Sequence, residues 1–295
     1  MSGGAIIVLV AATVLPHVPR ERKGLASGAI FLGIGLGIAG SGTIVPLLLQ
    51  HGLRATWLGL GTISGLLTAA TWFAWPMSVP ASQASHVARD PAAPAPARPM
   101  PDLLLLYGQY GLMAIGLVPA MVFLVDFVAR GLGAGAHLGA VFWVLYGVGA
   151  IIGPPLYGLL GDRLRARAAL RLALLVQVLA VASLFLFSNR AVLAAATILV
   201  GTFPPGIVPL ALTRIHELVV HDAQGQNVAW SRATIVFAAL QAASGYAYSA
   251  VFTASGGNHR VLFLIAAAAL AIALLADLAW LVFAGRGRGG RAGAK

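Results

Sequence analysis

The chain contains no cysteine, which excludes disulfide bridges, cysteine-ligated metal sites and thiol chemistry. Charge is also scarce, because Asp, Glu, Lys and Arg together make up 9% of the 295 residues, whereas soluble domains have about 25%. Acidic residues are the rarest charged group, with 8 against 19 basic residues. So few charges exclude an ordinary soluble domain. The net charge of +11 does not indicate a nucleic-acid partner, because the charges lie in short segments between apolar runs.

What the chain does have is long apolar sequence, with 59% hydrophobic residues. Several windows exceed the roughly 18 residues that a helix needs to cross about 30 Å of hydrocarbon. The sequence therefore predicts an all-α, polytopic membrane protein in contact with membrane lipid. We predict one partial span at residues 4–15 and eight full spans. The full spans are predicted at Leu25–Leu49, Thr56–Trp75, Leu103–Val128, His137–Leu160, Ala168–Phe187, Ala191–Leu218, Ala229–Thr253 and Val261–Phe283.

The spans fall into two groups separated by a linker. Residues 76–101 are rich in Pro, Ala and Ser, a composition typical of an interdomain linker. Residues 1–75 then form a first part that begins in the middle of a helix, without the basic start of a signal peptide. Residues 102–284 form a six-helix part, and we expect the basic, Gly-rich tail at 285–295 to be disordered.

The distribution of positive charge predicts the orientation. When loops are assigned alternately to the two sides of a membrane, one side receives 15 of the 19 Lys and Arg residues. The other side receives only Arg54, Arg130, Arg190 and Arg260. Because positive residues are retained inside, the linker and the C-terminus are expected to be cytoplasmic.

The most basic connection contains Gly158-Leu-Leu-Gly-Asp162-Arg163-Leu-Arg165-Ala-Arg167. Its arginines mark the cytoplasmic side, but orientation does not explain the acid among them. Two interpretations stay open. The connection is either a conformational latch or a solvated, positive-inside loop.

This G-x-x-x-D-R-x-x-x-R pattern, after the second helix of a six-helix unit and behind a long linker, resembles the major facilitator superfamily. Four further stretches resemble its YbfB/YjiJ branch: residues 25–49, 123–133, 201–218 and 230–248. The resemblance implies two six-helix halves around a central pathway, each built from inverted repeats. It also implies that this chain begins inside helix four of twelve.

On this resemblance the chain is a secondary-active transporter for a small solute, coupled to protons or another solute, in the bacterial inner membrane. Transport is expected to be impaired by the missing helices. The alternative is a membrane fragment that does not transport. The resemblance also implies a latch of Gly158, Asp162, Arg163 and Arg167, with the acid facing the start of the second span near residues 24–27. A helix N-terminus offers unpaired N–H groups to a carboxylate.

Polar and aromatic stripes on the later spans suggest a substrate cavity. Adjacent prolines interrupt one span near mid-membrane and free carbonyl groups, which are tolerated only towards protein or a water-filled cavity. Polar side chains in lipid likewise turn inward. The candidate lining residues are Tyr107, Tyr110, Phe142, Tyr146, Thr202, Pro205, Pro209, Gln241, Ser244 and Tyr248. Simple helix packing stays open for the proline span, as does an interfacial aromatic belt for Tyr107 and the neighbouring Trp143.

The ionisable residues near the membrane suggest two ion-pair sites. Asp126 and Arg130 are four residues apart and are expected to pair. Arg214, Glu217 and Arg232 are expected at the inner ends of consecutive spans as a possible gate. Asp277, in contrast, has no obvious partner in the sequence.

Two further segments of the sequence resemble known motifs. Gly33, Gly37 and Ser41 form a small-residue stripe that predicts close helix packing; the Gly-x-Gly-x-x-Gly run that overlaps it follows no strand, which excludes a dinucleotide site. His216-Glu217-Leu-Val-Val-His221 has the wrong spacing for zinc on one helical face. We therefore expect no enzyme activity, no cofactor, no metal and no nucleic-acid partner.

Overall fold

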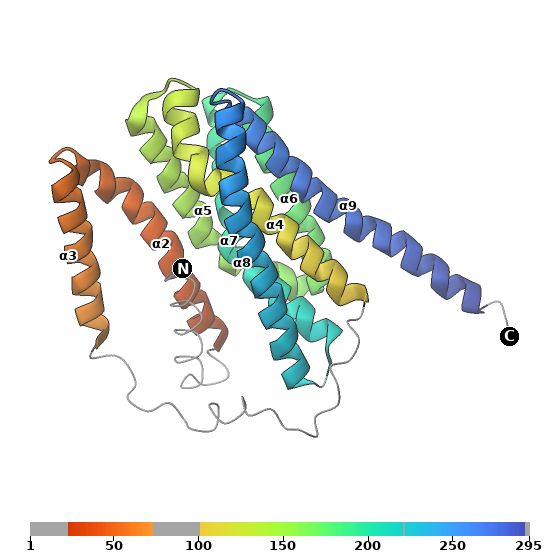
Figure 1. Ribbon diagram of the computed structural model, residues 1–295. Helices are drawn as coiled ribbons and strands as arrows, with labels where there is room; N and C mark the ends of the chain where they lie inside the picture. The colour runs from red at the N-terminus through yellow and green to blue at the C-terminus, as the bar shows by residue number, and fades with distance from the viewer. Residues whose placement is uncertain (1–22, 73–100, 221, 293–295) are drawn as a thin grey trace.

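The computed structural model describes residues 23–72, 101–220 and 222–292, and within these ranges the chain is helical without strands (Figure 1). The helices are α2 (Lys23–Leu49), α3 (Leu53–Trp72), α4 (Pro101–Asp126), α5 (Gly135–Arg163), α6 (Ala166–Leu186), α7 (Arg190–Leu218), α8 (Ala223–Ala254) and α9 (His259–Ala292). A π-helical turn, η4 (Phe127–Gly131), directly follows α4. All of the long helices except α3 are long and apolar enough to cross a membrane. The predicted polytopic helical fold is confirmed.

The helices begin and end within a few residues of the predicted spans, except at the start of α8 and the C-terminal end of α9. The predicted partial span at 4–15 and nearly all of the linker lie outside the described residues. α9 continues to Ala292 and so includes most of the tail at 285–295.

The six helices α4 to α9 form one bundle. Within it, α5 packs on α7, α4 packs on α8 and α9, and α6 packs on α7 and α9. The bundle core contains large buried side chains such as Phe127, Tyr146, Phe203 and Phe263. On one side α2 packs along α5, and α3 is the outermost helix there, with α9 at the other side (Figure 1).

Glycines bring α5 within backbone contact of its neighbours. A Cβ atom at Gly149 would lie 2.1 Å from the Ile198 carbonyl oxygen, and one at Gly153 would lie 2.1 Å from the Thr202 oxygen. No side chain fits in such a gap, so both positions require glycine. The backbones of α5 and α7 are therefore in direct contact, as small residues permit in membrane helices.

The packing stripe on α2 differs from the predicted one. Gly33 and Gly37 have open space where a Cβ would stand. Gly35 and Gly42 instead face α5, with a Cβ at Gly35 only 2.5 Å from the Ile151 backbone nitrogen. Ser41 of the predicted stripe does contact α5, because its Oγ accepts from Trp143 Nε1 at 3.0 Å. The prediction was wrong for Gly33 and Gly37, because glycines recur on several faces of α2 and spacing alone does not choose among them.

The basic connection is shorter than predicted. α5 continues through Arg163 and α6 begins at Ala166, so only Leu164 and Arg165 lie between them. Arg165 has a φ of +36°, which is uncommon outside glycine. Gly158 and Asp162 therefore belong to the last turns of α5 rather than to a loop.

Candidate functional site

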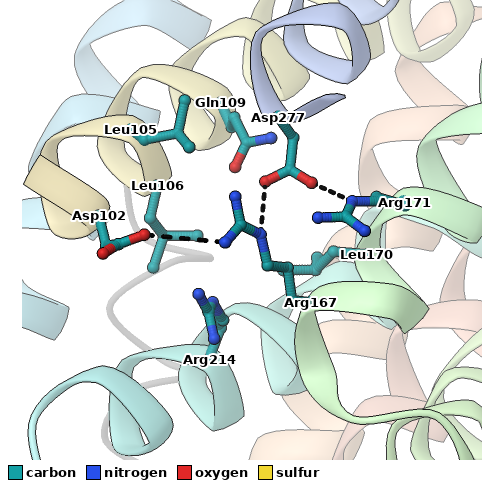
Figure 2. Close-up of a pocket in the computed structure, with 9 residues that line it drawn as sticks. All are labelled: Asp102, Leu105, Leu106, Gln109, Arg167, Leu170, Arg171, Arg214 and Asp277. Atoms are coloured by element: carbon teal, nitrogen blue, oxygen red, sulfur yellow. Dashed lines mark hydrogen bonds and ion pairs between the residues drawn. The ribbon is translucent and has the colours of Figure 1, made fainter. Parts of the chain in front are cut away.

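A cluster of charged side chains joins α4, α6, α7 and α9 at the end of the bundle that carries the arginines of the α5–α6 connection, called here the basic end (Figure 2). At its centre lies Asp277 of α9, whose side chain is only 5% exposed. Arg167 Nε donates to its Oδ1 at 3.0 Å, and Arg171 Nε donates to its Oδ2. The two arginines stand four residues apart on α6, so they present both guanidinium groups to one carboxylate.

Two contacts attach the start of α4 to this cluster. Asp102 Oδ1 accepts from Trp280 Nε1 of α9 at 2.9 Å and lies 3.8 Å from Arg167 Nη1. Gln109 is buried, and its Nε2 donates to the carbonyl oxygen of Ala273 at 3.0 Å. α4, α6 and α9 are therefore bound to one another by side-chain polar contacts as well as by apolar packing.

The cluster has nearly no free space. Its cavity volume is about 10 Å³, which is room for about one water molecule. The Nη2 atoms of Arg167 and Arg171 are buried without a hydrogen-bond partner, and buried donors of this kind are ordinarily satisfied by protein or water. The cluster therefore suits a structural role with one bound water better than a solute site.

A second polar contact at the basic end connects α7 to the start of α6. Glu217 Oε1 accepts from the backbone nitrogen of Ala166 at 3.0 Å, and its Oε2 accepts from Arg214 Nη1 at 2.9 Å. A carboxylate at a helix N-terminus satisfies a free N–H group and interacts favourably with the helix dipole. Arg232, predicted beside this pair, is exposed and takes part in no ion pair among the described residues.

The predicted latch receives no test from the structure. The side chain of Asp162 and those near the start of α2 lie outside the described part of the chain. Gly158 is half-buried and Arg163 is exposed. Arg167, which the resemblance placed in the latch, contacts Asp277 instead.

At the opposite end of the bundle, Asp126 has two partners. Arg130 Nε donates to Oδ1, and His259 Nε2 of α9 lies 2.7 Å from Oδ2. The sequence predicted the first contact and missed the second, because His259 is 133 residues away along the chain.

The ten predicted cavity residues are not gathered around one hollow. The cavity at the basic end contains none of them. Tyr107, Pro209 and Gln241 are half-buried, and the other seven are buried. Tyr110, for example, packs on Phe237 with ring centroids 4.6 Å apart. Tyr146 stacks on Trp143 at 5.2 Å.

The face of α8 that points away from the bundle differs from other exposed faces. Only 11% of its most apolar 18-residue window is buried, the same share as for α2, compared with 33% for α5, 44% for α6 and α9 and 56% for α4 and α7. The exposed side chains of α9 are mostly large aliphatic ones, whereas those of α8 are mostly Ala, Ser and Thr. The exposed small residues from 234 onward are Thr234, Ala238, Ala239, Ala242, Ala243, Ala247, Ser249, Ala250, Thr253 and Ala254, and the larger Tyr246 is exposed among them.

Gln241 lies near the middle of this helix and has no strong partner. Its Nε2 lies 3.7 Å from the Met121 sulfur, and sulfur is a weak acceptor. A polar amide at that depth is costly in lipid. The hydroxyls of Thr234 and Thr253 bond to carbonyl oxygens of α8 itself, so Gln241 is the polar group that most needs a partner. Together with the small side chains around it, this amide indicates that this face of α8 meets water, a solute or another helix rather than lipid tails.

The partners of Asp277 are the main feature that sequence reasoning missed. The prediction that Asp277 has no obvious partner was wrong, because Arg167 and Arg171 both bind its carboxylate. A signal did exist, since a membrane acid is rarely left unpaired and the arginines lie four apart on a neighbouring helix. The sequence does not show how the helices are arranged, however, so it could not indicate that these arginines bind the acid on α9 rather than take part in the latch.

Comparisons with known proteins identify the family of the chain. A search of curated proteins found no match. The family model described as "Uncharacterised MFS-type transporter YbfB", in which MFS denotes the major facilitator superfamily, matches residues 1–278. The chain therefore belongs to the YbfB-type family of major facilitator superfamily transporters.

Proposed function

We propose that this chain carries a small solute across a membrane by alternating access, and that the open face of α8 borders the path of the solute. The observation that carries the proposal is Gln241, a half-exposed amide in the middle of a membrane helix without a strong partner. Membership of a transporter family supports the same function. The half-buried Tyr107 of α4 completes the proposed lining.

The buried candidates have a different role in this proposal. Side chains such as Tyr110, Tyr146 and Tyr248 pack within the bundle and keep the helices at fixed distances. Alternating access in such folds moves rigid bundles against each other around a central site. The charged cluster around Asp277 makes α4, α6 and α9 suitable as parts of one rigid body.

We further propose the orientation and the energy source. The basic end faces the cytoplasm of a bacterial inner membrane, as the positive-inside rule predicts, and a proton or solute gradient drives transport. The solute is small and hydrophobic to amphipathic, in keeping with aromatic side chains near Gln241 such as Phe237.

A second candidate is a membrane protein that does not transport by itself. The observation that favours it is α3, which packs mainly against α2 and has Thr56 as its only buried residue within Leu53–Trp72. A helix so uncovered indicates that a transport-competent assembly contains protein surfaces beyond those described.

Flux measurements in proteoliposomes distinguish the two candidates. The purified chain is reconstituted with a pH dye inside, a proton gradient is imposed, and a panel of amphipathic cations, aromatic acids and sugars is added. We expect at least one solute to accelerate the collapse of the gradient in wild type and the Gln241→Ala variant to weaken that effect. The Ile272→Val variant, at an exposed position of α9 outside the proposed lining, is the control for nonspecific damage. Absence of any solute-dependent collapse of the proton gradient, in protein whose cooperative thermal unfolding shows that it is folded, contradicts proton-coupled transport and favours the second candidate.

A further inference from the structure

α4 and α9 are joined by side-chain polar contacts at both of their shared ends. At the basic end the contacts are Asp102 with Trp280 and Gln109 with the Ala273 carbonyl. At the opposite end the contact is Asp126 with His259. Helices tied in this way move together unless one of the ties is released.

The tie at the opposite end depends on one carboxylate. Asp126 uses one oxygen for His259 and the other for Arg130. The histidine side chain is 7% exposed, the aspartate is 24% exposed, and the arginine is 78% exposed. The ring of Phe252 on α8 lies edge-on to the imidazole at 4.7 Å. Water therefore reaches the carboxylate, while the imidazole is held in a fixed place.

The imidazole also lies against an unusual segment of backbone. The π-helical turn η4 begins directly after Asp126, and Leu132 N donates to the Phe127 carbonyl at 2.8 Å. A Cβ atom at Gly131 would lie 3.0 Å from His259 Nδ1, so the ring packs directly on this turn. π-Helical turns are rare and occur frequently at functional sites. The position of the histidine and the conformation of η4 are therefore coupled.

The two ties differ in their response to pH. The contacts at the basic end are made by Asp102, Trp280 and Gln109 and involve no histidine. The contact at the opposite end uses a histidine, a residue that ordinarily changes charge between pH 5 and 8. The other ionisable groups near the opposite end do not offer a second partner. Arg260 of α9 donates to the Phe185 carbonyl and to Ser188, and His137 of α5 is exposed without an ion pair. The described end of α8, from Gln241 to Ala254, carries no charged residue.

We propose that Asp126 and His259 form a proton-binding clasp that holds the end of α4 and its π turn against α9. With a proton added, the imidazolium donates a charge-assisted hydrogen bond to the carboxylate, which is stronger than the neutral bond. The clasp is closed at acidic pH, and it loosens as the imidazole loses its proton. On the orientation proposed above, this end faces outward, so the proton comes from outside the cell. Only the link from the clasp to solute movement rests on the proposed transport function.

Hydrogen–deuterium exchange of the full chain in lipid nanodiscs tests the clasp without any substrate. Peptides covering residues 127–134 are followed between pH 5.5 and 8, with correction for the intrinsic pH dependence of exchange. We expect exchange about five-fold slower at the acidic end, from the difference between a charge-assisted and a neutral hydrogen bond. The His259→Gln variant keeps a donor but does not titrate, so its corrected exchange is expected to be flat. The His137→Gln variant is the matched control and is expected to behave as wild type.

Two outcomes overturn the proposal: a wild-type profile that is flat with pH, or a pH dependence that survives in His259→Gln. A second measurement covers a failure of that variant to fold. In wild type with labelled histidine, the imidazole resonance of His259 is expected to titrate together with the exchange profile, and a titration that does not coincide with it also overturns the proposal. Because neither measurement needs flux, absence of transport would leave the clasp intact, and a flat profile would leave transport intact.

Discussion

Replacement of Asp277 by Asn is expected to destabilise the bundle strongly. The substitution removes the charge between Arg167 and Arg171 and leaves both guanidinium groups in a nearly closed cluster. Breaking a buried ion pair costs about 3–5 kcal/mol. We expect about 3 kcal/mol, at the low end of that range, because the arginine side chains keep 22% and 23% exposure. The remaining acid, Asp102, lies 3.8 Å from Arg167 and compensates little.

The assay is thermal or detergent-induced unfolding of the purified variants, each compared with wild type. Asp102→Asn is the matched control, because its carboxylate is 36% exposed, and a loss of about 1 kcal/mol or less is expected for such a group. A second variant, Asp277→Asn with Arg171→Met, is expected to recover part of the stability, since it removes one of the two charges that Asp277→Asn leaves without their partner. Equal stability of Asp277→Asn and Asp102→Asn, or no recovery in the double variant, would refute the reasoning.

Three further predictions follow from single contacts. Gly153→Ala places a methyl group against the Thr202 carbonyl and is expected to lower the free energy of unfolding by about 1–3 kcal/mol. Gly158→Ala, on the same helix, has open space for the methyl group and is expected to be neutral or stabilising. A larger loss of stability in Gly158→Ala than in Gly153→Ala would contradict the backbone contact between α5 and α7. Asn189→Ala removes the side chain that accepts from two backbone nitrogens at the start of α7 and is expected to cost about 1 kcal/mol, so an unchanged unfolding midpoint would contradict the cap. Asp162→Asn is expected to shift the balance between inward- and outward-facing states if the latch exists, and unchanged thiol accessibility across engineered cysteines would rule the latch out.

The helices themselves could be predicted from the sequence. Apolar runs long enough to cross a membrane predict the approximate ends of most spans, because hydrocarbon thickness sets the length of a helix. The span predicted at Thr56–Trp75 is the exception, because α3 is not among the seven described helices that are long and apolar enough to cross a membrane. α5, for instance, was predicted at His137–Leu160 and is found at Gly135–Arg163. The family could also be predicted, since the basic pattern and the accompanying stretches occur in order along the chain.

The contacts between helices could not be predicted in the same way. Asp277 meets arginines 106 and 110 residues away, and its partners depend on how α6 and α9 face each other. The glycines of α2 show the same limit, because several faces carry small residues and only the position of α5 decides which one packs. The π turn after Asp126 leaves no pattern in the sequence, and neither does its contact with His259, which is 133 residues from Asp126 along the chain.

The central claim is that the open face of α8 borders an aqueous path through the membrane. Because the chain has no cysteine, the variants Gln241→Cys and Ile272→Cys each carry a single thiol. Gln241 lies 13 residues before the end of α8 at Ala254, and Ile272 lies 13 residues after the start of α9 at His259, so the two positions are equally far from their helix ends. Ile272 is among the large aliphatic residues exposed on α9. A membrane-impermeant maleimide, applied to the reconstituted protein, is expected to label Gln241→Cys and to leave Ile272→Cys unlabelled. Equal labelling of the two, or no labelling of Gln241→Cys from either side of the membrane, would contradict the account.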